Sequence, residues 1–279
     1  MDRFRVALIS ISLNPNYWQY LSPMFESAKK HFLKGHEVDY LAWTDMPLDA
    51  QVGATKLFAA EPAEWPAPTL FRYSLFLDQK DFLSEYDFIF YCDADMLFVS
   101  PIGDEVLGEG LTLAQHPMYA LRREYTPPYE PDIASTAFIP RLGRVINTNG
   151  KKRFEPLYLA GGFQGGRSDS FIEAMEVMKK DIDVNFHNNK IAIWNDESHW
   201  NAYNFLHNSI LREDGSPSGI VKDGTVVLNP SFIYPDSLNK DYYQKVWGRN
   251  YVPKLITLTK KFSLTTEGGA NLQARLGTY

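Results

Sequence analysis

The chain has 279 residues, of which 44% are hydrophobic and 14% aromatic, and its formal net charge is −6. A disordered chain would carry fewer aromatic residues, and an acidic chain without a long basic run is not typical of nucleic-acid binding or of a polybasic membrane anchor. Cys92 is the only cysteine, so an intrachain disulfide is excluded. Because neither a signal peptide nor a membrane-spanning apolar segment is evident, we expect a soluble, cytoplasmic protein.

The first hundred residues alternate between strand and helix patterns. Residues 5–11 predict a first strand, followed by a loop. Ser22 is a plausible N-cap for a helix with Pro23 at its first position and Gly35 beyond its end. Residues 36–43 predict a second strand, and residues 45–68 predict a loop with short elements. Apolar residues at helical spacing over 71–83 predict a helix, and the buried-looking run 87–92 predicts a strand.

The second part of the chain is less regular. We expect a strand at 111–114, an inserted loop at 140–156, an amphipathic helix at 169–180, a second helix at 196–206 and a mobile tail over about 251–279. The strand–helix alternation of the first part predicts a doubly wound α/β sheet. Such sheets bind ligands at the carboxyl ends of their strands, which places the residues after Cys92 at the ligand crevice.

The triplet Asp93-Ala94-Asp95 directly follows the predicted strand 87–92. Two carboxylates at i and i+2 on extended backbone point the same way, and Mg²⁺ and Mn²⁺ prefer carboxylate oxygens shared with substrate phosphates. A metal there would act as a Lewis acid on a diphosphate leaving group. The alternative is a turn with an aspartate cap. The chain contains a second triplet of the same pattern, Asp181-Ile182-Asp183, with which the first can be compared. We predict that this second triplet is a solvated helix end.

Two further motifs attract attention. The run from Trp194 to His199 places Asp196 and Glu197 beside a tryptophan at a predicted helix start. Asp196 alone would be explained as an N-cap, and Trp194 is either core packing or a platform for a sugar ring. In the run 160–166, four glycines within residues 161–166 imply close backbone approach. Without a following Gly-Lys-Ser/Thr, this run predicts a tight turn rather than a phosphate loop.

Together, these motifs resemble glycosyltransferase family six, the family of the histo-blood-group A and B transferases and the α-1,3-galactosyltransferase. The resemblance spans roughly residues 5–236. Its most specific part is the Trp-x-Asp-Glu-Ser-His-x-Asn pattern of residues 194–201. The other similar stretches are residues 27–32, 88–95, 134–140 and 161–166.

The resemblance implies a single GT-A domain over 1–279, with a doubly wound mixed sheet and two abutting halves. A nucleotide-binding half would cover about 1–100 and an acceptor and catalytic half about 101–250. The family moves galactose or N-acetylgalactosamine from a UDP-sugar to a β-galactoside, with retention and in α-1,3 linkage. The implied cofactor is Mn²⁺ or Mg²⁺, and the implied partners are the UDP-sugar donor and the oligosaccharide acceptor.

The resemblance also implies roles for individual residues. Asp93 and Asp95 would bind the metal, and Glu197 would be the catalytic carboxylate. Small residues at Ala160 and Gly162 favour N-acetylgalactosamine. The donor-binding residues would be Ile11, Ser12, Leu13, Tyr17, Arg72, Asp93, Ala94, Asp95, Ser135, Ala160, Gly161, Gly162, Asp196, Lys260 and Arg275. The acceptor-binding residues would be His116, Thr136, Trp194 and Glu197.

The chain also departs from the family pattern. Asn195 stands where many relatives have histidine, the loop 141–156 is longer than usual, and Lys260, Lys261 and Arg275 are only approximate matches for the basic groups that close over the diphosphate. Because the chain begins at the catalytic domain, we expect a bacterial or phage-type member. Some bacterial members replace both aspartates and need no metal, so Asp93 and Asp95 favour a metal-dependent enzyme.

Three questions stay open at the level of sequence. Glu197 could form a covalent intermediate, as in retaining glycosidases, or act electrostatically in a front-face transfer. The chain could be another GT-A enzyme, such as a glucosyltransferase or a sugar nucleotidyltransferase. Residues 13–17 do not fit the Gly-rich, basic loop that sugar nucleotidyltransferases usually have after the first strand. It could also be a non-catalytic glycan-binding module, which would not need Asp95 and Glu197 together.

Overall fold

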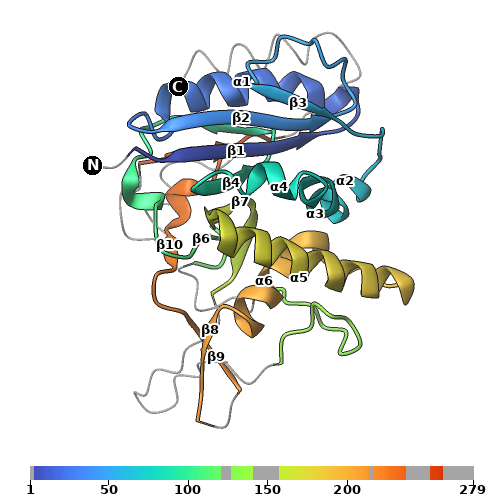
Figure 1. Ribbon diagram of the computed structural model, residues 1–279. Helices are drawn as coiled ribbons and strands as arrows, with labels where there is room; N and C mark the ends of the chain where they lie inside the picture. The colour runs from blue at the N-terminus through green and yellow to red at the C-terminus, as the bar shows by residue number, and fades with distance from the viewer. Residues whose placement is uncertain (1–2, 121–126, 141–156, 214–215, 237–251, 260–279) are drawn as a thin grey trace.

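The computed structural model describes residues 3–120, 127–140, 157–213, 216–236 and 252–259 (Figure 1). Its centre is a seven-stranded mixed sheet with strand order β10-β6-β7-β4-β1-β2-β3. All neighbouring strands pair in parallel except β7, which is antiparallel to both β4 and β6. The strands are β1 (Arg5–Ser12), β2 (Glu37–Thr44), β3 (Lys56–Ala59), β4 (Phe88–Cys92), β6 (Leu111–Gln115), β7 (Leu159–Arg167) and β10 (Val226–Leu228).

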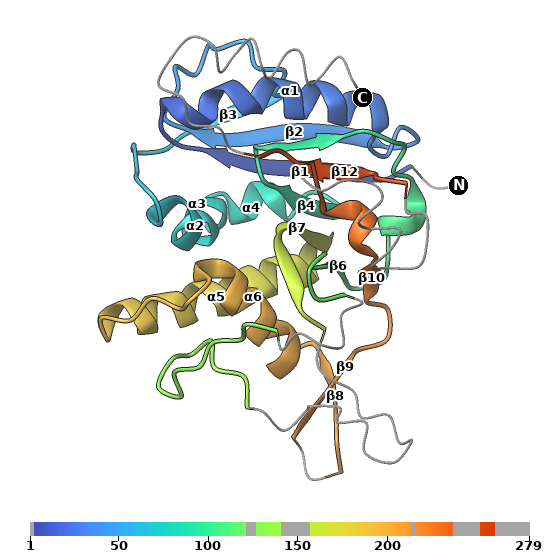
Figure 2. The ribbon, with the colours of Figure 1, turned by 180° about the vertical axis from the view of Figure 1, so that it is seen from behind.

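The central strand β1 is buried from Val6 to Ser12, and its run Val6–Ile9 is apolar, because both faces of the sheet are covered. Val6 and Leu8 pack into one hydrophobic cluster with helix α1 (Pro15–His31). Ala7 and Ile9 point the other way, into a cluster with α3 (Arg72–Leu77) and α5 (Ser168–His187). Figures 1 and 2 show α1 on one side of the sheet and α3 and α5 on the other. The expected doubly wound mixed sheet is therefore confirmed.

Helix α1 begins eight residues before its predicted first position, so the assignment of Ser22 as N-cap is wrong. Asn14 is the cap instead, and its side chain accepts a hydrogen bond from the backbone N–H of Asn16 at 3.0 Å. Pro15 takes the first helical turn, where its missing N–H costs nothing. Pro23 therefore lies inside the helix.

The region predicted as one helix over 71–83 is helical but interrupted. It follows α2 (Ala67–Leu70) and divides into α3 and α4 (Lys80–Leu83). Phe71, between α2 and α3, has left the helical geometry with φ −98° and ψ 0°. The break matters for the site because it places Arg72 at the start of α3.

The glycine-rich run is not a tight turn; it lies in strand β7, so that prediction is wrong. A Cβ atom at Gly165 would lie 2.3 Å from the carbonyl oxygen of Ile89 on β4. At Gly166, where φ is +134°, a Cβ atom would lie 2.3 Å from the carbonyl oxygen of Gly110. A side chain at either position would clash with the backbone of β4 or of the residues at the start of β6, so glycine is required at both.

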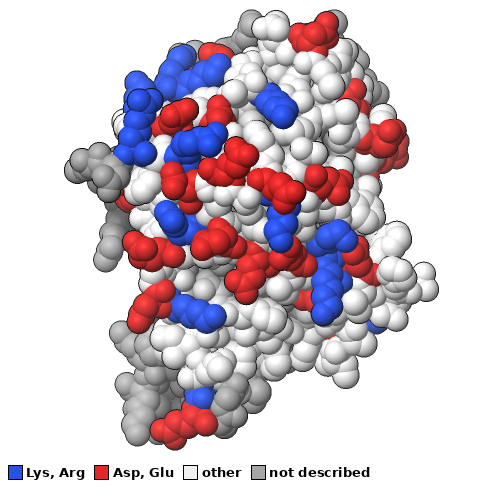
Figure 3. Space-filling view, in the orientation of Figure 1, with Lys and Arg blue, Asp and Glu red and all other residues white. Residues whose placement is uncertain are grey.

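Helix α5 is longer than predicted and continues to His187, so Asp181-Ile182-Asp183 is not a helix end. The second predicted helix is confirmed as α6 (Asn195–Leu206). Among the described residues, no helix has the length and apolar character needed to cross a membrane. On the face shown in Figure 3, acidic and basic side chains are interspersed, and ion pairs such as Lys80–Glu176 and Lys179–Asp183 lie on the surface.

Smaller elements complete the fold. The predicted tail includes an ordered strand, β12, which joins a three-stranded sheet; residues 260–279 and most of the predicted loop 140–156 lie outside the described residues. The remaining elements are β5 (Met96–Phe98), η1 (Asp104–Val106), β8 (Ser209–Leu211), β9 (Pro217–Val221), η3 (Pro230–Phe232), β11 (Tyr234–Pro235) and β12 (Leu255–Thr257).

Candidate functional site

The triplet Asp93-Ala94-Asp95 forms a turn between β4 and β5, not the extended backbone that the sequence suggested. The N–H of Met96 donates to the carbonyl of Asp93 at 3.2 Å, which closes the turn. The N–H of Asp93 donates to the carbonyl of Gly162 on β7 at 2.9 Å. The triplet is therefore fixed at the carboxyl end of β4, the edge at which α/β sheets bind ligands.

A cavity of about 110 Å³ opens beside this turn. Its walls combine aromatic and apolar side chains with the carboxylates of the triplet, the usual composition of a small-molecule site. Trp65, which is 69% exposed, belongs to this wall and was missed in the sequence because it lies in an irregular segment without periodicity. The lining residues are Ile11, Leu13, Asn14, Tyr17, Trp65, Pro68, Thr69, Tyr91, Asp93, Ala94 and Asp95.

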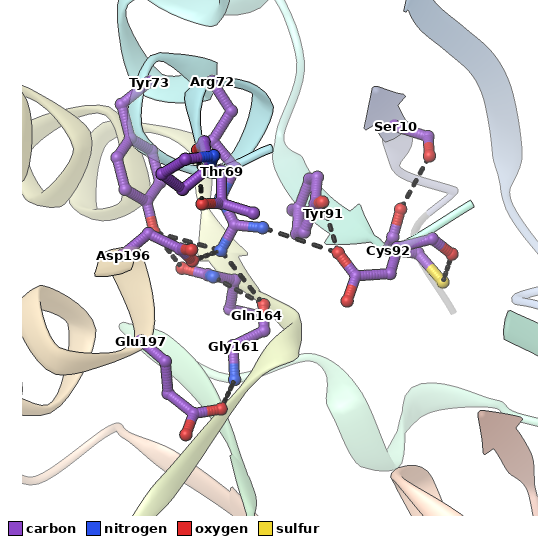
Figure 4. A network of polar contacts seen from close by, with 12 residues as sticks. Ser10, Thr69, Arg72, Tyr73, Tyr91, Cys92, Gly161, Gln164, Asp196 and Glu197 are labelled. Atoms are coloured by element: carbon purple, nitrogen blue, oxygen red, sulfur yellow. Dashed lines mark hydrogen bonds and ion pairs between the residues drawn. The ribbon is translucent and has the colours of Figure 1, made fainter. Parts of the chain in front are cut away.

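Arg72 is the centre of a buried polar network (Figure 4). Its guanidinium forms an ion pair with Asp196, bonds Asp93 Oδ1 at 3.5 Å and donates to the carbonyl of Gly161 at 3.2 Å. The arginine side chain is only 2% exposed. Burial by itself would lower the pKa of Arg72, but the nearby carboxylate of Asp196 holds that pKa well above its usual value. Arg72 therefore joins β4, β7 and α6 as a permanent cation.

Glu197 is held by two hydrogen bonds. The N–H of Gly161 donates to Oε2 at 2.9 Å, and the phenol of Tyr158 donates to Oε1 at 2.8 Å. Burial raises the pKa of Glu197 to about 7, although the Gly161 and Tyr158 donors oppose the shift. The side chain of Glu197 and the backbone N–H of Asp93 are thus bonded to adjacent residues of β7, Gly161 and Gly162.

Asp196 and Glu197 occupy the first turn of α6. The helix dipole favours negative charge at this position. Burial nevertheless raises the pKa of Asp196 to about 6, against the opposing effect of Arg72. Trp194, the N-cap residue, is 49% exposed, and its backbone N–H donates a hydrogen bond to Ser198 Oγ at 3.1 Å. A half-exposed tryptophan is thus positioned at the start of the helix that carries the two carboxylates.

Comparison with known proteins supplies the family. The model of glycosyltransferase family 6 matches residues 5–211. The chain belongs to glycosyltransferase family 6. It is 27% identical over 250 residues to histo-blood group ABO system transferase 1 of Rattus norvegicus, covering 85% of this chain and 64% of the relative. The mixed sheet with helices on both faces is the GT-A-like fold expected for the family.

Two further relatives carry other glycosyltransferase names. The chain is 28% identical over 229 residues to human globoside alpha-1,3-N-acetylgalactosaminyltransferase 1, covering 79% of this chain and 58% of the relative. It is 24% identical over 198 residues to the Escherichia coli O-antigen biosynthesis glycosyltransferase WbnI, covering 70% and 80%. The chain thus spans about three fifths of the length of the two mammalian relatives.

Several residues assigned by family resemblance lie at the site. Ile11, Leu13 and Tyr17 line the cavity with the aspartate triplet. His116 makes an edge-to-face contact with Tyr158, with ring centroids 5.6 Å apart, and burial lowers the pKa of His116 to about 4. Ala160, Gly161 and Gly162 lie on β7 between Asp93 and α6. Their proposed roles in family 6 chemistry stay predictions.

Other assigned residues have different surroundings. Ser12 is buried, and its carbonyl accepts a hydrogen bond from Thr44. Ser135 and Thr136 are attached to α5: Ser135 Oγ accepts from Asn185 at 2.9 Å, and Thr136 Oγ1 donates to the carbonyl of Asp181 at 2.8 Å. Lys260 and Arg275 lie outside the described residues.

The donor set near the cavity fits a hard divalent cation. Asp93 and Asp95 supply carboxylate oxygens, the ligands that Mg²⁺ and Mn²⁺ prefer. A Cβ atom on Gly162 would lie 2.9 Å from Asp93 Oδ2, so the missing side chain keeps space beside that oxygen. Within the described part of the chain, no group of three or more His, Cys, Asp or Glu is arranged to hold a metal. A cation here would need further oxygen ligands, such as those of a diphosphate or water.

Proposed function

We propose that this family 6 chain is a retaining hexosyltransferase. It would move N-acetylgalactosamine or galactose from a UDP-sugar, in α-1,3 linkage, to a β-galactoside-type acceptor. One observation carries the proposal: β7 joins a cavity lined by two aspartates to a buried glutamate, through the adjacent residues Gly161 and Gly162. The human relative, a globoside alpha-1,3-N-acetylgalactosaminyltransferase, supports N-acetylgalactosamine as the sugar and the α-1,3 linkage.

The nucleotide would enter the cavity beside the aspartate triplet. Tyr17 and Trp65 offer aromatic faces for the uracil ring, and Ile11 and Leu13 offer apolar contacts. Asp93 and Asp95 would hold Mn²⁺ or Mg²⁺ near the diphosphate. Charge supports this cofactor, because Arg72 is already paired with Asp196 and Asp93, and a diphosphate anion would otherwise approach a region rich in carboxylates.

The donor sugar would lie between β7 and the start of α6. Arg72 fixes Asp196, whose carboxylate would accept hydrogen bonds from the sugar hydroxyls. A Cβ atom on Gly161 would lie 3.3 Å from both Asp196 Oδ2 and Glu197 Cβ, so a larger residue would crowd the two carboxylate side chains. The small residues Ala160 and Gly162 favour N-acetylgalactosamine as the donor sugar.

In the chemical step, Glu197 would be the anion next to the anomeric carbon of the donor sugar, the carbon that reacts. Departure of UDP creates positive charge on the sugar, and a bound divalent cation would neutralise the leaving diphosphate. The carboxylate of Glu197, oriented by Gly161 and Tyr158, stabilises or attacks that carbon. Retention follows when the acceptor oxygen adds on the face that UDP has left and its proton passes to the leaving diphosphate. If Glu197 has attacked the carbon, the bond between them breaks in the same step and frees the carboxylate. His116 and Trp194 would contact the acceptor.

A donor panel tests this proposal. Purified protein is incubated with Mn²⁺, lactose and each of UDP-N-acetylgalactosamine, UDP-galactose and UDP-glucose, and both UDP release and the trisaccharide product are measured. We expect transfer from at least one of the first two donors, α-configured product and loss of activity in EDTA. Inert behaviour of both donors would reject the proposed substrate class, and full activity in EDTA would reject the metal role of Asp93 and Asp95.

A further inference from the structure

Tyr91 lies on β4 two residues before Asp93, and its phenol donates a hydrogen bond to Asp93 Oδ1. We propose that Tyr91 is a positioning residue that keeps Oδ1 against the protein, so that Oδ2 is the oxygen that Asp93 offers to a divalent cation. This inference rests on the metal-dependent function proposed above. It assigns a role to a tyrosine that would not itself touch metal or donor.

The Oδ1 side of Asp93 is fully engaged. Besides the phenol of Tyr91, Nη1 of Arg72 lies 3.5 Å from the same oxygen. The guanidinium of Arg72 also lies over the Tyr91 ring, 4.1 Å from its centroid, and is anchored at its other end by Asp196 (Figure 4). Tyr91 is 2% exposed. The phenol and the guanidinium therefore support each other as they hold Oδ1.

The Oδ2 side is kept open. Asp93 exposes 39% of its side chain and lines the cavity. The neighbour of Oδ2 is Gly162, where even one added carbon would approach to 2.9 Å. The terminal torsion of an aspartate is broad, so without the phenol the carboxylate could rotate and present either oxygen. Hydrogen bonds to ligating carboxylates tune metal affinity in the same way elsewhere.

Tyr73 is a matched control within the same network. It is fully buried, lies beside the same guanidinium with Arg72 5.2 Å from its ring centroid, and has its oxygen 3.5 Å from Arg72 Nη2. Its phenol, however, donates to Gln164 Oε1 at 3.1 Å and not to Asp93. Tyr91→Phe and Tyr73→Phe each remove one buried hydroxyl next to Arg72, but only the first removes a bond to Asp93.

The test measures Mn²⁺ binding directly, by the electron paramagnetic resonance signal of free Mn²⁺ in the presence of saturating UDP. We expect Tyr91→Phe to weaken Mn²⁺ binding by about 10-fold and Tyr73→Phe to change it by less than about twofold. In transfer assays, the Mn²⁺ concentration that gives half-maximal activity should rise by the same factor in Tyr91→Phe. At saturating Mn²⁺, kcat of this variant should equal that of the wild type. Equal Mn²⁺ affinities of Tyr91→Phe and wild type would overturn the inference.

A second variant tests the other oxygen of the Asp93 carboxylate, Oδ2. Gly162→Ala should crowd Oδ2 and also weaken Mn²⁺ binding by about 10-fold, and unchanged affinity would overturn the assignment of Oδ2 as the open oxygen. Thermal unfolding without metal shows whether each variant is folded. If wild-type protein with UDP takes up no Mn²⁺ at all, the proposed metal-dependent function fails, which is distinct from a failure confined to Tyr91.

Discussion

The chain carries two Asp-x-Asp triplets, and the fold places them in opposite environments. Asp93-Ala94-Asp95 forms a turn at the carboxyl end of a central strand and lines a cavity. Asp181-Ile182-Asp183 lies inside α5, where residues two apart do not face each other. The same three-residue pattern can therefore line a cavity in one place and lie along a helix in another.

The contacts of the two triplets differ as much as their backbone. Asp93 is bonded by a buried arginine and a buried tyrosine. Asp183 pairs with Lys179 one helical turn earlier, and both side chains are 40% exposed. Ile182 points into the core. The first triplet thus differs from the second by the buried network around it, and the variants below test that difference.

Glu197→Gln should produce the largest loss. It removes the anion next to the reacting carbon while keeping the shape of the side chain, and loss of one preorganised electrostatic group costs about 100- to 1000-fold in kcat. UDP and Mn²⁺ binding should persist, because those contacts belong to the first triplet. The measurement is initial-rate transfer alongside UDP calorimetry; a variant with the wild-type rate would remove Glu197 from the chemistry.

Substitution within the two triplets compares them directly. Asp93→Asn should lower kcat/KM for transfer by about 100-fold, since a neutral amide is a poor ligand for a hard cation. Asp183→Asn should leave kcat/KM within about twofold. Both variants are assayed at the same Mn²⁺ concentration. Similar losses in the two variants would mean that the surroundings do not distinguish the triplets.

The pH dependence separates the site carboxylates from those on the helix surface. The pKa of Glu197 is about 7 because burial favours its protonated form. Transfer needs the ionised form, so kcat/KM should rise with pH towards a plateau above about pH 7. Tyr158→Phe removes a donor that favours the ionised carboxylate and should move this rise to higher pH. Asp183→Asn should leave the profile in place, and an unshifted profile in Tyr158→Phe would contradict the assignment to Glu197.

The smallest effect concerns stability. Loss of the exposed Lys179–Asp183 pair in Asp183→Asn should lower the free energy of unfolding by about 0.3–0.5 kcal/mol, the usual size for an i, i+4 pair. Urea unfolding measures this value. A loss above about 1 kcal/mol would show that the second triplet has a structural importance that its exposure does not indicate.

The sequence predicted those parts of the fold whose local pattern agrees with their surroundings. Strand β4 is a continuous run of apolar and aromatic residues, β1 and β2 are rich in apolar and aromatic residues, and α6 has acidic residues in its first turn. The predicted start of α1 was wrong because Asn14-Pro15 and Ser22-Pro23 both have the pattern of an N-cap followed by proline. Tertiary packing decides which of them begins the helix. Strand β7 was missed because its glycines are explained by the approach of β4 and β6, which no local pattern reveals.

The site was predictable only in part for the same reason. Asp93 and Glu197 stand in recognisable motifs, so family resemblance could identify them. The pairing of Arg72 with Asp196 joins residues 124 positions apart. Trp65 lies in a proline-rich segment without any periodic signal. These contacts exist only once the sheet has formed. The same holds for the role of Tyr91, whose hydrogen bond to Asp93 gains its meaning from the neighbouring contact of Arg72 with the same oxygen.

The most direct test of the account is the binding of UDP to wild-type protein by calorimetry, with Mn²⁺ and again with excess EDTA. If the first triplet holds a cation for the diphosphate, UDP should bind with Mn²⁺ and at least about tenfold more weakly in EDTA. Asp93→Asn should bind UDP as weakly with Mn²⁺ as wild type does in EDTA. Equal UDP affinity under the two conditions would contradict the central claim that Asp93-Ala94-Asp95 is a metal and diphosphate site.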